Sequence, residues 1–187
     1  RTLTPVGAPV VSAKPTCEGT RTYTYTFADC EGNQQDWTYT YTVVYQPFAN
    51  PADAGTTVPC ADDTDITPTL PVVTDNCGRV LTPVGPPVVS AKPLCGGTRT
   101  YTYSYVDCAG NQQDWVYTYT VTPPVFTLPA NGGSTVACIA DAQVIPVPPA
   151  VQNSCGDNLQ VSAPVVGSDP LCTGVKTYTF TYTDCTG

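Results

Sequence analysis

Aromatic residues alternate with threonine in two stretches near the start of the chain. A period of two residues is typical of a β-strand, in which successive side chains point to opposite faces. Rings bury more apolar area than threonine methyl groups, so we expect the aromatic face to point into the core. The rings belong to Tyr23, Tyr25, Phe27, Trp37, Tyr39 and Tyr41. The opposite, outward face then holds Thr22, Thr24, Thr26, Thr38, Thr40 and Thr42.

The outward threonines admit three interpretations. Threonine forms strands well and stays soluble, which is enough to explain a threonine-rich surface. The same hydroxyls are candidate sites for O-linked sugars, whereas the sequence contains no Asn-x-Ser/Thr site for N-linked sugars. A flat threonine array like those of ice-binding proteins is the third interpretation.

The chain contains an internal repeat. Residues 1–43 return as residues 79–121 with 34 of 43 positions identical, and a looser third copy occupies residues 157–187. The period is 78 residues and then 77, and one unit carries four cysteines. We interpret each repeat as one small domain and the chain as a window on a longer array. The expected domains are the C-terminal part of one repeat, a complete repeat and the N-terminal part of the next, at residues 1–45, 46–123 and 124–187.

Strand and turn signals alternate within the complete repeat, and no segment shows the apolar spacing of a helix. Pro68 and Pro71 indicate that one strand lies at the edge of its sheet, and the Gly-Pro-Pro sequence at 85–87 interrupts another strand. The pattern therefore predicts an all-β fold. The expected strands are residues 54–60, 66–75, 79–90, 97–107 and 114–121.

The composition limits the cellular compartments and the classes of function that fit the chain. Ten cysteines at regular spacing favour an oxidising compartment and a disulfide-stapled fold. The sequence has neither histidine nor a close Cys-x-x-Cys pair, which argues against zinc and removes the commonest general base, so we expect no enzyme. A net charge of −8 with only seven basic residues argues against a nucleic-acid partner. No apolar run approaches the roughly 18 residues of a membrane span, so we expect none.

The strand between neighbouring cysteines prevents them from pairing. Residues 20–28 separate Cys17 from Cys30 by roughly 30 Å at about 3.3 Å per residue, whereas a disulfide needs Cα atoms within about 7 Å. Because consecutive strands run in opposite directions along the domain, cysteines that can pair are those at the same end of one domain. Each such disulfide could add roughly 3–4 kcal/mol to the stability of the domain. Cys17 and Cys30 are then expected to pair outside this sequence. The predicted disulfides are Cys60–Cys95, Cys77–Cys108, Cys138–Cys172 and Cys155–Cys185.

The turn and strand motifs resemble a known repeat. The residues "TDNCG" (74–78) and "TRTYTYSYVDCAGNQQDWVYTYTV" (98–121) are similar to the HYR-type immunoglobulin-like repeat. Cysteine-rich repeats resembling these recur in tandem in very large secreted or surface proteins of Bacteroidetes-type bacteria. The resemblance covers essentially the whole chain and implies tandem immunoglobulin-like antiparallel β-sandwich domains, an extracellular location and no catalytic residues. The third unit departs from the pattern, because "QNSCG" (152–156) lacks the aspartate found at Asp75.

Two segments are candidates for calcium, a cation that prefers clustered oxygens. The acidic turn at 61–65 contains three aspartates, whereas the equivalent turn at 139–143 contains only Asp141. We therefore interpret the acidic turn as a solvated turn. The loop that begins at Asp107 is the better candidate, although turn formation alone also explains its residues. The candidate ligands are Asp107, Asn111 and Asp114, which recur as Asp29, Asn33 and Asp36. No other cofactor is expected.

These observations favour a structural function. We expect stiff tandem domains in an extracellular fibre or stalk, with neighbouring repeats as partners and self-association into a filament. The alternative is an adhesin whose repeats contact a sugar or a surface, and exposure of Tyr23 or Trp37 in a common patch would favour it. Phe48 and Phe126 lie at equivalent places in proline-rich connections. Each either fixes a domain junction or is an ordinary core residue.

Overall fold

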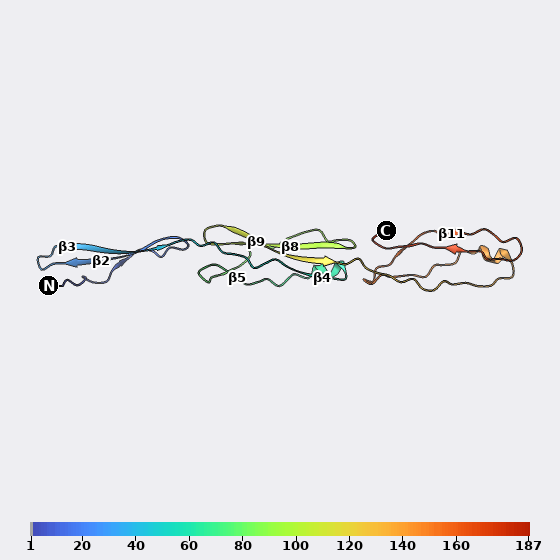
Figure 1. The fold of residues 1–187 in the computed structure, drawn as a ribbon, viewed down its shortest axis with the longest axis horizontal. Helices are drawn as coiled ribbons and strands as arrows, with labels where there is room; N and C mark the ends of the chain where they lie inside the picture. Colours follow the sequence, from blue (N-terminus) through green and yellow to red (C-terminus); the bar gives the residue numbers. More distant parts are fainter. Residues whose placement is uncertain (1) are drawn as a thin grey trace. The chain divides into compact units, whose positions relative to one another are not determined.

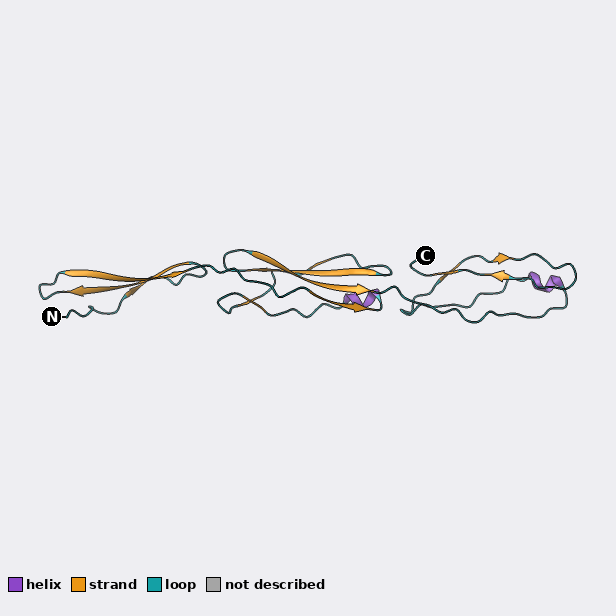
Figure 2. Cartoon of the chain, in the orientation of Figure 1, coloured by secondary structure: helices purple, strands orange, loops and turns teal. Residues whose placement is uncertain are grey.

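The computed structural model describes residues 2–187, and these residues form strands and two short 3-10 helices (Figures 1 and 2). The all-β prediction is confirmed. In chain order the elements are β1 (Val10–Val11), β2 (Gly19–Ala28), β3 (Gln34–Val43), β4 (Ala54–Val58), η1 (Ala61–Asp65), β5 (Val73–Thr74), β6 (Val80–Leu81), β7 (Val88–Val89), β8 (Gly97–Val106), β9 (Gln112–Val121), η2 (Ile139–Gln143), β10 (Gln160–Val161), β11 (Val165–Val166), β12 (Tyr178–Thr179) and β13 (Tyr182–Thr183).

The strands form sheets within successive repeats. The first repeat contains the sheet β1-β2-β3, and the complete repeat contains the sheet β4-β9-β8-β7 and the pair β5-β6. The third repeat contains the pairs β10-β13 and β11-β12. The pairs β1-β2, β2-β3 and β5-β6 are antiparallel as expected, but β4 runs parallel to β9, which the sequence pattern does not indicate.

The contacts of the chain form two compact units, and the division between them runs through the middle repeat. Unit 1 consists of Arg1–Asp53, Thr69–Val88 and Thr102–Val116, and unit 2 consists of Ala54–Pro68, Val89–Tyr101 and Tyr117–Gly187. Each unit therefore combines parts of two consecutive repeats.

The aromatic face of the complete repeat is buried, as predicted. Along β8 the tyrosines at 101, 103 and 105 are buried, and the small polar residues between them are only half-buried. On β9, Trp115 and Tyr119 are 3% and 5% exposed. Hydroxyl groups at the edge of this core are satisfied by backbone, because Tyr101 donates to the carbonyl of Thr64 at 2.7 Å and Tyr119 donates to that of Ile66 at 2.8 Å.

In the first repeat the rings of β2 are half-buried and those of β3 are exposed, which corrects the prediction for β3. Trp37, Tyr39 and Tyr41 on β3 are 54%, 48% and 56% exposed. In the complete repeat, the segment that leads from the buried Phe48 through η1 to the buried Val73 supplies the other side of the core. In the first repeat the described residues before β2 form β1, which pairs with β2 and leaves the rings of β3 exposed.

Strand β4 depends on β9 in the same way. Its five residues pair in parallel with Tyr117–Val121, and this approach is so close that a Cβ at Gly55 would overlap the carbonyl oxygen of Thr118. The corresponding residues 132–136 of the third repeat form no strand. The edge strand expected at 66–75 is reduced to β5, which begins after its two prolines.

Candidate functional site

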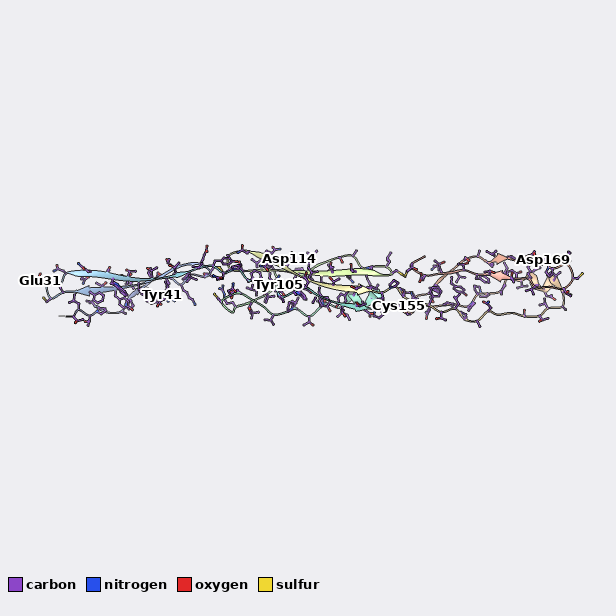
Figure 3. All side chains as sticks on the ribbon, in the orientation of Figure 1. Glu31, Tyr41, Tyr105, Asp114, Cys155 and Asp169 are labelled. Atoms are coloured by element: carbon purple, nitrogen blue, oxygen red, sulfur yellow. A yellow bond between two sulfur atoms is a disulfide. The ribbon has the colours of Figure 1, made fainter. Side chains whose placement is uncertain are left out.

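Three disulfides join cysteines of consecutive repeats. Cys17 and Cys95 occupy equivalent positions and bond to Cys108 and Cys185, which are also equivalent to each other. The sequence separations are 91, 95 and 90 residues, each longer than one period. Cys155 lies beside the segment that leads into η1 (Figure 3). The bonds are Cys17–Cys108, Cys60–Cys155 and Cys95–Cys185.

These bonds correct the predicted pairing, which assumed that both cysteines belong to the same repeat. Cys60 and Cys95 both lie in unit 2, but each bonds to the third repeat instead of to the other. Each cysteine therefore reaches the adjoining repeat, where its partner lies within 5.6 Å between Cα atoms. The structure contains none of the predicted bonds Cys60–Cys95, Cys77–Cys108, Cys138–Cys172 and Cys155–Cys185, and it pairs Cys17 within this sequence.

Four cysteines remain as exposed thiols. They are not a random subset, because each is the equivalent of a bonded cysteine whose partner lies one repeat before or after it. Cys77 corresponds to the bonded Cys155, and Cys138 corresponds to the bonded Cys60. The free cysteines are Cys30, Cys77, Cys138 and Cys172.

A cavity of about 70 Å³ in unit 1 lies against the Cys17–Cys108 disulfide and is also lined by Cys77. Its polar wall contains Asp107, which accepts a hydrogen bond from the hydroxyl of Tyr45 at 2.5 Å. Burial tends to raise the pKa of Asp107, but the hydrogen bonds from Tyr45 and from backbone N–H groups bring it below its usual value. The carboxylate is therefore ionised at neutral pH and raises the pKa of the Tyr45 phenol.

Tyr45 is a residue that sequence analysis missed. Its equivalent in the next repeat is Pro123, so the periodicity gives no signal for it.

The candidate calcium ligands take part in turn hydrogen bonding. Asp107 Oδ1 accepts hydrogen bonds from the N–H groups of Ala109 and Asn111, both at 2.9 Å. Asp114 lies away from this turn and accepts a hydrogen bond from the hydroxyl of Ser104 at 2.6 Å. Asp29 and Asn33 form the same turn in the first repeat, and Asp36 accepts from Thr26. Residues 2–187 contain no cluster of three metal-binding side chains, and the calcium site stays a prediction that this geometry does not favour.

The turn at Asp75 is built like the loop at Asp107. Asp75 Oδ1 accepts hydrogen bonds from the N–H groups two and four residues later, at 2.9 and 2.8 Å, and its other oxygen accepts from Arg79 Nε at 2.6 Å. Mainly the backbone N–H of Arg79, and then its side chain, hold the pKa of Asp75 below its usual value against the effect of burial. In the third repeat Asn153 forms the same two backbone hydrogen bonds, so loss of the aspartate leaves the turn intact.

A charged cluster in unit 2 ties η1 to the start of β8. Lys92 donates to Asp65 at 2.8 Å and also contacts Asp62, while Arg99 contacts Asp65 and donates to the Thr64 hydroxyl. Because Asp65 is hydrogen-bonded by Lys92 and then by Arg99, its pKa lies below its usual value.

The third repeat keeps this arrangement with different charges at two of its positions. Asp169 stands where Lys92 stands in the complete repeat, and Gln143 replaces Asp65. Lys176 donates to Asp169 at 2.6 Å and to Gln143 at 2.5 Å (Asp169 is labelled in Figure 3). The position of the cluster is thus kept while its charges vary between repeats.

The outward threonines of the first repeat differ in exposure between the two strands. The β3 threonines are exposed and the β2 threonines are half-buried, and nothing in the structure tests their glycosylation.

Phe48 is 2% exposed, and its carbonyl accepts a hydrogen bond from Gln113 of β9, which favours an ordinary core residue of its own repeat. Phe126 is 36% exposed. A junction role for either residue stays a prediction.

Tandem all-β repeats that are bonded to each other by disulfides are typical of extracellular structural or adhesion-type proteins. The model of the HYR-like domain with 4 cysteines matches residues 1–43, 48–121 and 126–187. The chain belongs to this family of HYR-like domains. A search among curated proteins found no match.

The disulfides and the family are consistent with an extracellular location. Among residues 2–187, no helix has the length and the apolar character needed to cross a membrane. The family match identifies no source organism.

Proposed function

We propose that the chain is a non-enzymatic segment of a stiff extracellular fibre or stalk, in which disulfides bond each HYR-like repeat to the next. The observation that carries this proposal is the pairing itself. Each of the three disulfides joins consecutive repeats, and none closes a loop inside one repeat. A bond inside a repeat would stabilise that domain alone, whereas a bond between repeats transmits force past the backbone.

The pairing defines the path that tension takes through the chain. Starting from Arg1, the shortest covalent path runs to Cys17, crosses to Cys108, returns along β8 to Cys95 and crosses to Cys185. It contains sixteen residue steps before Cys17, thirteen along β8 and two after Cys185. All other residues lie in loops that bear no load once the disulfides are taut.

Stretching single molecules by their termini tests the proposal. With the disulfides intact, the path above and two Cα–Cα crossings of 5.4 Å limit the extended length to about 120 Å at about 3.5 Å per residue. After reduction, the whole chain can extend to about 650 Å at the same rise. Extension well beyond about 120 Å without reductant would show that the repeats are not covalently joined, and would overturn the proposal.

The second candidate is an adhesin whose repeats bind a sugar or a surface. It is favoured by the exposed rings of Trp37, Tyr39 and Tyr41, which line a groove of about 500 Å³ in unit 1. The buried state of the equivalent rings in the complete repeat argues against it, because a ligand site of the repeat should be open in every copy. Binding of oligosaccharides with a shift in the Trp37 fluorescence emission would support the adhesin.

A further inference from the structure

We propose that unit 1 holds an acceptor site for a segment of another four-cysteine HYR-like repeat, which lies along β3 and forms a disulfide with Cys77. The acceptor site consists of the exposed rings of β3, the half-buried rings of β2 beside them and the cavity at Cys77. The segment has the character of residues 46–68 of this chain, with an apolar anchor, a strand, a cysteine and an acidic turn. This proposal deepens the proposed function, because it names the partner of a free cysteine.

The register of β4 in the complete repeat shows how such a segment fits. There, Val58 lies opposite Val121 at the end of β9, and Cys60 follows two residues later. The equivalent of Val121 in the first repeat is Val43, the last residue of β3. A segment in the same register along β3 would therefore bring its cysteine just beyond Val43.

The cavity at Cys77 lies where this cysteine would arrive. Val44 and Tyr45, which directly follow β3, line it together with Cys77. Cys77 is the equivalent of Cys155, and Cys155 is bonded to Cys60 of the preceding repeat. The described residues thus contain one completed example of the arrangement, at Cys155, and one in which the equivalent cysteine, Cys77, is a free thiol.

The open rings supply the apolar part of the site. Trp37 is 54% exposed, whereas the equivalent Trp115 is 3% exposed beneath the segment that begins at Phe48. Trp115 Nε1 also donates to the carbonyl of Ala52 at 3.0 Å, a contact that a bound segment could offer to Trp37. Covering several large rings is favourable by roughly 25 cal/mol per Å² of apolar surface removed from water, so the rings favour an extended segment with an apolar anchor.

Charge selects the kind of segment. Lys14 and Arg21 are the equivalents of Lys92 and Arg99, which contact the aspartates of η1. Within residues 2–187, neither Lys14 nor Arg21 has an ion pair, and Arg21 Nε has no hydrogen-bond partner. The turn that follows the partner cysteine is therefore acidic, like residues 61–65 and unlike the η2 turn of the third repeat.

A peptide with the sequence of residues 46–68 tests the proposal on the whole chain. Its cysteine carries a 2-thiopyridyl group, so that the Cys77 thiolate attacks the peptide sulfur and forms the new disulfide. Pyridine-2-thione leaves with the reducing equivalents and takes up the proton of the thiol, so no other oxidant is needed. Peptide mapping should show modification of Cys77 at least about tenfold faster than of the other free thiols, because binding raises the local concentration of the peptide. The Trp37 emission should shift to shorter wavelength.

Two matched controls separate recognition from simple thiol reactivity. A peptide with D62N and D65N should modify Cys77 more slowly and leave the rates at Cys30 and Cys172 unchanged. The C77S variant should lose the adduct in the cavity but keep the Trp37 emission shift, since that shift needs only the bound peptide.

Equal modification of all four exposed thiols, or equal rates with a scrambled peptide, would overturn the proposal. A dimer joined through Cys77 and Cys138 that forms in preference to the peptide adduct would also overturn it, because the η2 turn after Cys138 lacks the counterparts of Asp62 and Asp65. The stretching experiment depends only on the three disulfides already formed, so the two proposals can fail independently.

Discussion

At the scale of single residues, the repeats keep a backbone geometry while changing the charges attached to it. Asp75 and Asn153 stand at equivalent positions and form the same turn. The residue four places later is Arg79 in one repeat and Asp157 in the other. The carboxylate of Asp75 is paired with a cation, whereas Asn153 donates to the carboxylate of Asp157 at 3.2 Å.

The D75N variant should have a lower free energy of unfolding than the wild type at neutral pH. That free energy should also change less between neutral pH and acid than it does in the wild type. Because the pKa of Asp75 is lower in the folded than in the unfolded chain, its contribution is present above the unfolded value and is lost as the pH falls through the folded value. Chemical unfolding at neutral pH and near pH 3 should therefore show a smaller difference for D75N than for the wild type.

The reverse substitution N153D is the matched control. It places a second carboxylate beside Asp157, so it should destabilise the chain most at neutral pH and least in acid, where the carboxylates are protonated. If N153D destabilises the chain as much near pH 3 as at neutral pH, repulsion between the two carboxylates does not govern the effect.

At the scale of elements, β4 shows that a strand can depend on a partner outside its own sequence. Gly55 lies so close to Thr118 on β9 that no side chain fits, while the equivalent Gly133 has open space around it. The two segments are similar in sequence, yet only the one beside β9 forms a strand.

The substitution G55A should destabilise the chain by about 1–3 kcal/mol, the usual cost of overpacking. G133A should change stability by less than about 0.5 kcal/mol, as for an ordinary exposed position. Thermal and chemical unfolding of both variants measure the difference. Equal effects would show that the parallel β4-β9 pairing does not form.

The elements that could be predicted are those whose signal is local. Strands β8 and β9 alternate over ten residues each, so their extent and buried face follow from the pattern. The same pattern is present in β3, but burial of its rings needs a covering segment that periodicity cannot supply. The cysteines share this limit: strand direction sorts them into two ends, but which repeat provides the partner is decided by packing between repeats.

At the scale of the molecule, the three disulfide loops overlap. The loop from Cys17 to Cys108 overlaps the loop that begins at Cys60, which in turn overlaps the loop that ends at Cys185. Every peptide bond between Cys17 and Cys185 therefore lies inside at least one loop.

Overlapping loops make the chain resistant to severing by a protease. A single cut anywhere between Cys17 and Cys185 leaves the two pieces joined through sulfur, whereas disulfides confined to single repeats would let a cut between domains separate them. After limited digestion to one cut per molecule, we expect the protein to keep its full mass without reductant and to fall into two fragments with it. Two fragments without reductant would contradict the overlap. In a habitat rich in secreted proteases, such a chain would stay in one piece even after its backbone had been cut.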